Sequence, residues 1–259
     1  MGHLNHENYF TKENKHLSNS KISDWLKSKH YFYKKHISCE TSQSVTDAMV
    51  LGSAVDTWLT ESREEFEKQY IQVTRRTRKG DTPWRYQLNK TLYDAVENMC
   101  TSAEDSPALK ALADYETQKI LQSDIQLGHF EGIAGIPDWI KIDGDTCEIV
   151  DLKTAKTIDP SRYHWHCIDF GYYRQQAMYQ ILAENIYKCK KFRSRHVVIE
   201  KDPDGINHVQ TFILNQGRIN KDKDFLFQVF ESIKNEKDFL PHKASWDDAI
   251  EIGGMEEDI

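Results

Sequence analysis

The chain has 259 residues, 39% of them hydrophobic, and a formal net charge of −7, which suits one substantial core and a single domain rather than two. No apolar run approaches the roughly 18 residues that span a bilayer, and the first ten residues lack the basic-then-apolar pattern of a secretory signal. We therefore expect a cytoplasmic protein that makes no membrane contact.

Cysteine spacing and local charge narrow the class further. The five cysteines are widely spread with no Cys-x-x-Cys pair, so we expect reduced thiols rather than a disulfide framework or a structural zinc site, with an iron–sulfur cluster as the alternative. Basic residues gather in three runs, within residues 21–35, 75–85 and 188–195. Because phosphate binding depends on local patches, these runs are compatible with DNA in an acidic chain; ordinary solvated surface is the alternative.

The first 124 residues are predicted to be mainly helical. Capping residues and apolar positions at helical spacing predict helices over residues 18–33, from residue 44 or 46 into the polar stretch 61–68, over 83–100 and over 107–121. A short strand over residues 70–74 leads into a basic loop.

The pattern then changes to period two. Strands are predicted over residues 125–131, 134–142 and 146–153, followed by a polar loop, a helix over 172–188, strands over 196–200 and 209–214, and a helix over 219–237. Asp143-Gly144-Asp145 is a strong hairpin signal, and tight turns make the central strands antiparallel. The prediction is an α/β (α+β) fold whose mixed central sheet, with an antiparallel meander, is flanked by helices.

The segment 135–156 contains the residues with the clearest chemistry. Asp138 lies early in one predicted strand and Asp151 near the end of the next, while Lys153 lies two residues on and therefore on the same side of its strand. Carboxylate oxygens are the ligands that Mg²⁺ and Mn²⁺ prefer, and a lysine beside them can neutralise a phosphate. The alternative is a salt-bridged surface hairpin, which we disfavour because adjacent acids in a sheet repel unless a cation compensates.

Ile136-Pro137-Asp138 followed by Ile149-Val150-Asp151-Leu152-Lys153 resembles the PD-(D/E)xK nuclease superfamily. Within it, the chain resembles the RecB-like branch and the phage or prophage exonucleases of the exodeoxyribonuclease VIII type. Gln175 and Tyr179 match the branch's Gln-xxx-Tyr signature, and residues 48–56 match its helix with a Gly-xxx-His motif, except that Asp56 stands in place of the histidine. The resemblance covers roughly residues 17–215.

The resemblance implies a restriction-endonuclease-like core and a set of site residues. Asp138, Asp151 and the Leu152 carbonyl would hold one or two Mg²⁺ or Mn²⁺ ions, with Asp56 as a further ligand because aspartate oxygen suits these ions. Lys153 would activate water and steady the phosphate, with Gln175 and Tyr179 bordering the site. Surface positions remain the alternative for the residues outside the hairpin, and Glu131 is a weaker candidate acid.

Candidate DNA-binding residues are taken from the basic loop and the segments after the hairpin. Arginine grips phosphate in a bidentate manner and tryptophan can stack on a base. The residues predicted to contact DNA are Arg75, Arg76, Arg78, Arg174 and Trp165. His164 and His166 are also considered as a metal pair, but we expect them in a loop away from the acids.

The functional prediction is a metal-dependent exonuclease that degrades linear double-stranded DNA. From the resemblance we expect 5′-to-3′ polarity, a role in phage-type recombination, a single-strand annealing protein as partner and a ring-shaped homo-oligomer. An endonuclease or structure-specific nuclease of the same superfamily, and a non-catalytic DNA-binding relic, are the alternatives. We expect one nuclease domain over 1–259, comprising a helical part (1–124), a catalytic sheet core (125–215) and a helix with an acidic tail (216–259).

Overall fold

The computed structural model describes residues 4–11, 14–41, 45–78, 82–201 and 206–237. The predicted acidic tail lies outside this part of the chain. None of the described helices is long and apolar enough to cross a bilayer.

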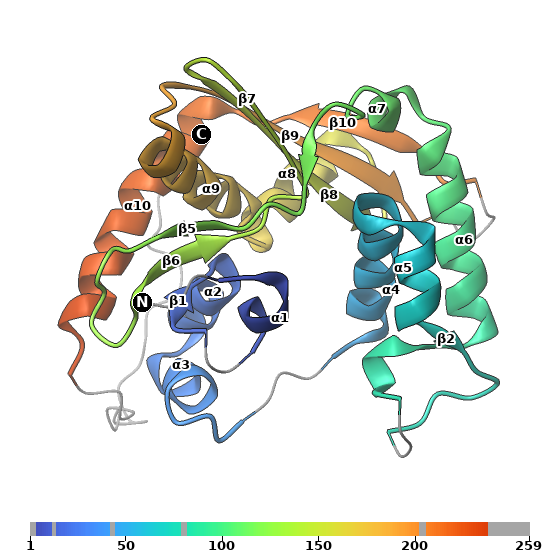
Figure 1. Ribbon diagram of the computed structural model, residues 1–259, viewed down its shortest axis with the longest axis horizontal. Coiled ribbons are helices and arrows are strands. Elements are labelled where there is room, and N and C mark those ends of the chain that lie inside the picture. The colour runs from blue at the N-terminus through green and yellow to red at the C-terminus, as the bar shows by residue number, and fades with distance from the viewer. Residues whose placement is uncertain (1–3, 12–13, 42–44, 79–81, 202–205, 238–259) are drawn as a thin grey trace.

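A five-stranded sheet forms the centre of the molecule (Figure 1). Its strands, in spatial order, are β10 (Val209–Ile213), β9 (Lys191–Glu200), β8 (Thr146–Ala155), β7 (Trp139–Asp143) and β4 (Glu116–Thr117). The β8 and β9 strands are parallel, whereas the other neighbouring pairs are antiparallel. The predicted mixed sheet with an antiparallel hairpin at Asp143-Gly144-Asp145 is therefore confirmed.

Helices pack on both faces of this sheet, because the apolar side chains of β8 point alternately to one face and the other. Cys147 and Ile149 pack into a cluster with α9 (Tyr172–Tyr187) and α10 (Gln216–Asn235). Val150 and Leu152 pack into a second cluster with α4 (Asp47–Asp56) and α6 (Lys90–Glu104). Figure 1 shows the two helix groups on opposite sides of the sheet. A strand buried on both faces explains the nearly continuous apolar lead into Asp151.

The predicted strand over 134–142 is wrong in one respect, because it is two strands in two sheets. The β6 strand (Gly132–Gly135) lies between β1 (His16–Leu17) and β5 (Leu121–Ser123) in a three-stranded sheet, whereas β7 belongs to the central sheet. The link 136–138 contains Pro137, which has no N–H to give a strand ladder. The chain therefore changes sheets immediately before Asp138.

Residues 125–131 form no strand. Gly128 adopts φ +61° and Leu127 exchanges backbone hydrogen bonds with Phe130, so this segment is a tight turn. The other short strands are β2 (Ile71–Gln72) and β3 (Gln87–Leu88), which pair in parallel.

The remaining helices are mostly short. They are α1 (His6–Tyr9), α2 (Asn19–Lys27), α3 (Lys29–His36), the π-helix η1 (Thr57–Glu61) that continues α4, α5 (Arg63–Gln69), the 3₁₀-helix η2 (Trp84–Tyr86), α7 (Pro107–Lys110) and α8 (Pro160–Asp169).

Local capping explains where helix predictions were wrong. Ser28 caps α3 and divides the predicted helix over 18–33. The helix predicted from residue 83 begins at Lys90, after the cap Asn89, and the one predicted over 107–121 ends at Lys110. Asp159 caps α8 with Pro160 in its first turn, so the predicted loop around His164 is helical. Each capping signal spans only three or four residues, whereas the helix predictions rest on apolar spacing over longer stretches. The predictions therefore miss these helix boundaries.

Gly135 allows α9 to lie close against β6. A Cβ built at Gly135 would be 2.6 Å from Tyr179 Cε1. We predict that Gly135→Ala displaces the Tyr179 ring and lowers the free energy of unfolding by about 1–3 kcal/mol, as overpacking does. Chemical denaturation measures this loss. Gly52→Ala in α4 is the control, since its new Cβ would make only an ordinary 3.7 Å contact with Thr154, and should leave stability unchanged or raised.

Candidate active site

Asp138 and Asp151 are brought together by the β7–β8 pairing. Asp138 lies in the link before β7, and its Oδ2 accepts a 2.6 Å hydrogen bond from the backbone N–H of Leu152. Asp151, in β8, is 1% exposed and forms an ion pair with Lys153. The Leu152 amide thus fixes one carboxylate beside the strand that carries the other.

Lys153 lies against the ring of Tyr172, the first residue of α9. Its ammonium lies 4.7 Å from the centre of the Tyr172 ring. Burial lowers the pKa of Lys153, but Asp151 and Asp138 act in the other direction and the net result is a raised pKa. Beneath it, the pKa of the buried His196 is held well below its ordinary value by burial and by Lys153. Lys153 is therefore the positive charge of this cluster and His196 is neutral.

Gln175 and Tyr179 connect Asp151 to the link that precedes Asp138. The Tyr179 hydroxyl donates to the Ile136 carbonyl at 2.9 Å and accepts from Gln175 Nε2 at 2.9 Å. Gln175 Nε2 also approaches Asp151 Oδ1 at 3.5 Å. One helical turn separates the two residues, so α9 contacts β8 and the link before β7 through a single face.

Asp56, at the end of α4, is linked to Asp138 by the side chain of Gln118. The sequence did not suggest Gln118 as a site residue. Gln118 Nε2 lies 3.4 Å from Asp56 Oδ1, 3.2 Å from Asp138 Oδ1 and 2.9 Å from Thr60 Oγ1. Gln118 was assigned to a predicted helix, but it follows β4 with φ +48°. No spacing signal marks it, because its partners lie 58, 62 and 20 residues away.

The three carboxylates share one ammonium group. Burial, followed by the charges of Asp151 and Asp56, raises the pKa of Asp138 well above its ordinary value. Burial, followed by the charge of Asp151, raises the pKa of Asp56 to about 7. Negative charge therefore exceeds positive charge in a partly buried place, an environment that favours a bound cation.

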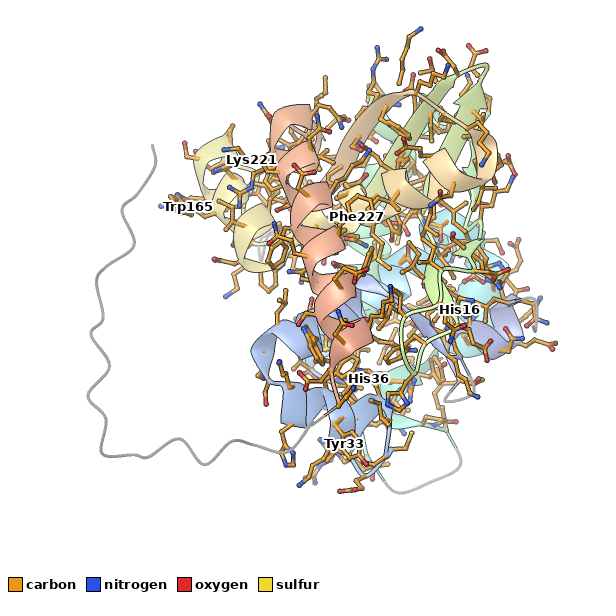
Figure 2. All side chains as sticks on the ribbon, turned by 90° about the vertical axis from the view of Figure 1, so that its left-hand side faces the viewer. His16, Tyr33, His36, Trp165, Lys221 and Phe227 are labelled. Atoms are coloured by element: carbon orange, nitrogen blue, oxygen red, sulfur yellow. The ribbon has the colours of Figure 1, made fainter. Side chains whose placement is uncertain are left out.

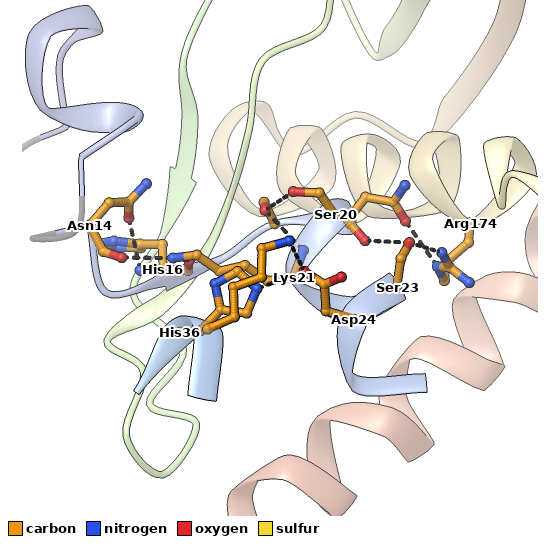
Figure 3. Close-up of polar contacts among 11 residues, drawn as sticks. Asn14, His16, Ser20, Lys21, Ser23, Asp24, His36 and Arg174 are labelled. Atoms are coloured by element: carbon orange, nitrogen blue, oxygen red, sulfur yellow. Dashed lines mark hydrogen bonds and ion pairs between the residues drawn. The ribbon is translucent and has the colours of Figure 1, made fainter. Parts of the chain in front are cut away.

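A cavity of about 600 Å³ opens beside Asp56, Asp138, Gln118 and Tyr179 and extends towards α2 and α3. Basic side chains of α2 and α3 line that far wall. Figure 3 shows the polar contacts that two of them, Lys21 and His36, make. Lys21 Nζ donates to the carbonyls of Asn14 and His16 at 2.7 and 2.8 Å, and burial lowers its pKa to about 8. Lys35 and His36 both contact Asp24. The cavity thus runs from the acidic cluster to a wall of basic groups held by the protein itself.

The predicted DNA-binding residues divide into two kinds. The Arg76 side chain is 6% exposed, forms an ion pair with Asp47 and stacks 3.5 Å from the centre of the Trp84 ring. Arg174 donates to Asn19 Oδ1 at 2.9 Å and Ser23 Oγ at 2.6 Å, which ties α9 to α2. These two guanidinium groups are engaged within the protein.

Arg75 and Arg78 are exposed, and Trp165 is 62% exposed on α8 (Figure 2). The structure does not bring Glu131 into the cluster. Its carboxylate lies 3.9 Å from Lys15 beside β1. His164 lies on α8, and its Nδ1 is 3.2 Å from the hydroxyl of Tyr173 on α9.

The donor chemistry of the cluster fits a hard divalent cation. Within the described ranges, no three Asp, Glu, His or Cys side chains form a metal-binding group by themselves. Asp56 and Asp138 nevertheless each have a carboxylate oxygen near the side-chain amide of Gln118. Asp151 forms its ion pair with Lys153. Carboxylate and carboxamide oxygens are the ligands that Mg²⁺ and Mn²⁺ use.

Comparison with known protein families identifies the chain. A family model described as a PDDEXK-like domain of unknown function (DUF3799) matches residues 18–239. The chain belongs to this family. The prediction of the PD-(D/E)xK superfamily is thereby confirmed, and the membership supports a nuclease of that superfamily.

A solved structure shares the fold. A protein from Eubacterium rectale titled "Putative exonuclease" aligns with a TM-score of 0.64 and 17% identity over 91% of this chain and 88% of its own. The structure of SSO0001 aligns with a TM-score of 0.31 and 13% identity over 83% of this chain and 85% of its own, too weakly to support any inference. No curated protein matches the chain. The first likeness confirms the predicted fold.

The two kinds of arginine should respond differently to substitution. We predict that Arg174→Ala lowers the free energy of unfolding by about 1–3 kcal/mol, because it removes two hydrogen bonds and leaves their partly buried acceptors, Asn19 and Ser23, unsatisfied. Arg78→Ala, at an exposed position, should change stability by less than about 0.5 kcal/mol. Denaturation curves measure both variants. Equal stability of the two variants would contradict the assigned role of Arg174.

The raised pKa of Asp56 predicts a pH dependence of metal-free stability. A carboxyl whose folded-state pKa exceeds its unfolded value favours folding at low pH, and that stability is lost as pH rises from about 4 through about 7. In EDTA, Asp56→Asn should therefore be more stable than wild type at pH 8, by about 4 kcal/mol, and close to wild type at pH 4. Melting curves at the two pH values measure the difference. If Asp56→Asn is less stable than wild type at pH 8, the raised pKa of Asp56 is contradicted.

Proposed function

We propose that this protein is a Mg²⁺- or Mn²⁺-dependent deoxyribonuclease that acts as an exonuclease on linear double-stranded DNA. The observation that carries the proposal is the convergence of Asp138 and Asp151 with Lys153 at the β7–β8 pairing. Family membership and the shared fold with the Eubacterium rectale protein support it.

The roles of the residues follow from their positions. Asp56, Asp138, Asp151 and the Leu152 carbonyl would hold the ion, which supplies positive charge at the scissile phosphate and makes water more acidic. Lys153 stays protonated and donates to a phosphate oxygen, or orients the attacking water, from beside Asp151. Gln175 and Tyr179 would hold Asp151 and the link before Asp138 in fixed positions relative to each other.

The DNA would approach along the cavity and its basic wall. The cavity is lined by lysines and a histidine beside the acidic cluster, and this positive lining suits a polyanion. Arg75, Arg78 and Trp165 are the exposed candidates for further contacts with the duplex. Arg76 and Arg174 would act indirectly, by holding the segments on either side.

The finer features of the proposal come from the resemblance to exodeoxyribonuclease VIII-type enzymes. They are 5′-to-3′ polarity, a place in phage-type recombination in the bacterial cytoplasm, an annealing protein as partner, and a ring-shaped homo-oligomer. One nuclease domain over 1–259 would carry the activity.

Substitution of the central residues tests the proposal. We predict that Asp151→Asn and Lys153→Met each reduce Mg²⁺-dependent digestion of linear duplex by about 100-fold or more, because each removes a group that acts on the reacting phosphate. Release of labelled nucleotides from 5′- and 3′-labelled duplexes, with Mg²⁺ and with EDTA, measures the rate and the direction. Unchanged digestion by either variant would overturn the proposal.

A covalently closed circle separates the alternatives. An exonuclease needs an end and should leave the circle intact, whereas an endonuclease would open it. A DNA-binding relic would bind duplex but digest neither substrate. Arg63→Ala is the matched control, because this exposed arginine of α5 pairs with Glu67 and lies outside the three basic runs. This variant should digest linear duplex at the wild-type rate.

A further inference from the structure

Gln118 joins the two carboxylates that lie outside the Asp151–Lys153 ion pair. Its amide nitrogen is 3.2 Å from Asp138 Oδ1 and 3.4 Å from Asp56 Oδ1, and its backbone N–H donates to the Asp138 carbonyl at 3.1 Å. Its φ of +48° is a conformation that residues other than glycine seldom adopt. Such conformations persist where the surrounding structure enforces them, and they gather at functional sites.

The separations around this amide match those between neighbouring ligands of a metal ion. Oxygens bound about 2.1 Å from Mg²⁺ in an octahedron lie about 3 Å from one another. The end of the Gln118 side chain is at nearly that distance from one oxygen of Asp138 and one of Asp56. It therefore occupies a place suited to a ligand, not the place of the ion itself, which would be about 2.1 Å from both oxygens.

Thr60 can hold the amide in either orientation. Its Oγ1 accepts from Gln118 Nε2 at 2.9 Å and donates to the Asp56 carbonyl at 2.8 Å. A hydroxyl is both donor and acceptor, so after a half-turn of the amide it could donate to Gln118 Oε1 instead. The nitrogen faces two carboxylates when no cation lies between them, and the oxygen suits a cation-bound state.

A glutamine ligand also accounts for the shortage of ionisable ligands. No three Asp, Glu, His or Cys side chains among the described residues make a metal-binding group. Asp56 and Asp138 with the Gln118 carbonyl would give three side-chain oxygens at one point. Amide carbonyls are ordinary ligands for hard divalent ions, and a neutral one adds no further negative charge to an already acidic cluster.

We propose that Gln118 is a metal ligand of this site, with its nitrogen facing Asp56 and Asp138 when the ion is absent and its Oε1 facing the ion when it is bound. The inference rests on the proposed function, since it assumes that the site binds Mg²⁺ or Mn²⁺. The rival role is that of a hydrogen-bond donor alone, which would compete with the ion for the two carboxylates.

The two roles predict opposite changes in metal affinity. Mn²⁺ binding to the full chain at pH 8 is measured by calorimetry and by the loss of the free-ion electron paramagnetic resonance signal. Gln118→Leu should weaken binding by about 10-fold or more, at least the loss seen when an outer-shell partner is removed. Gln118→Glu, which keeps an oxygen at this position, should bind Mn²⁺ at least as tightly as wild type.

Gln122→Leu is the matched control, because Gln122 lies four residues further on and accepts from the Leu4 backbone N–H. It should bind Mn²⁺ as wild type does, and melting curves in EDTA check that each variant is folded. Affinity that is unchanged or tighter in Gln118→Leu, or weakened equally in Gln118→Glu, overturns the assignment of Gln118 alone. Failure of the wild-type protein to bind Mn²⁺ overturns the proposed function as well.

Discussion

One ammonium group faces three carboxylates where β8 passes the link between β6 and β7, and much of the surrounding structure restrains these charges. Asp138 is held by the Leu152 amide and Asp151 by Lys153. The uncompensated negative charge disfavours the fully ionised, metal-free state, as the raised pKa values of Asp138 and Asp56 indicate. Packing and hydrogen bonds elsewhere must stabilise the fold against this cost.

That stabilisation comes from both faces of the central sheet. The apolar residues of β8 alternate between the cluster beneath α9 and α10 and the cluster beneath α4 and α6. Elements that pack in each cluster also place polar groups beside the acids. The first places Gln175 and Tyr179 on one side, and the second ends α4 at Asp56 and continues it as the π-helix that carries Thr60. Irregular helical turns of this kind are common at functional sites.

The basic residues show why a charge pattern is a weak guide to a binding surface. Arg76 and Arg78 are two residues apart in one run, yet Arg76 is enclosed by Trp84 and Asp47 while Arg78 is exposed. Arg174 lies one position before the Gln-xxx-Tyr pair and points to α2 instead of the cavity. A guanidinium group can fill a buried polar position as readily as it can bind phosphate, and the sequence does not distinguish these uses.

The features that depend on local order along the chain could be predicted from the sequence. The apolar lead into Asp151, the two-residue step to Lys153 and the hairpin that pairs this strand with the one after Asp138 all lie within 20 residues, so strand geometry fixes their relation. The mixed sheet and its flanking helices followed from the same periodicities. The surroundings of these residues could not be predicted in this way, because they depend on the three-dimensional fold. The change of sheet at Pro137, the enclosure of Arg76 and Arg174, and the approach of Gln118 to acids 20 and 62 residues away depend on contacts between distant segments, which no local pattern encodes.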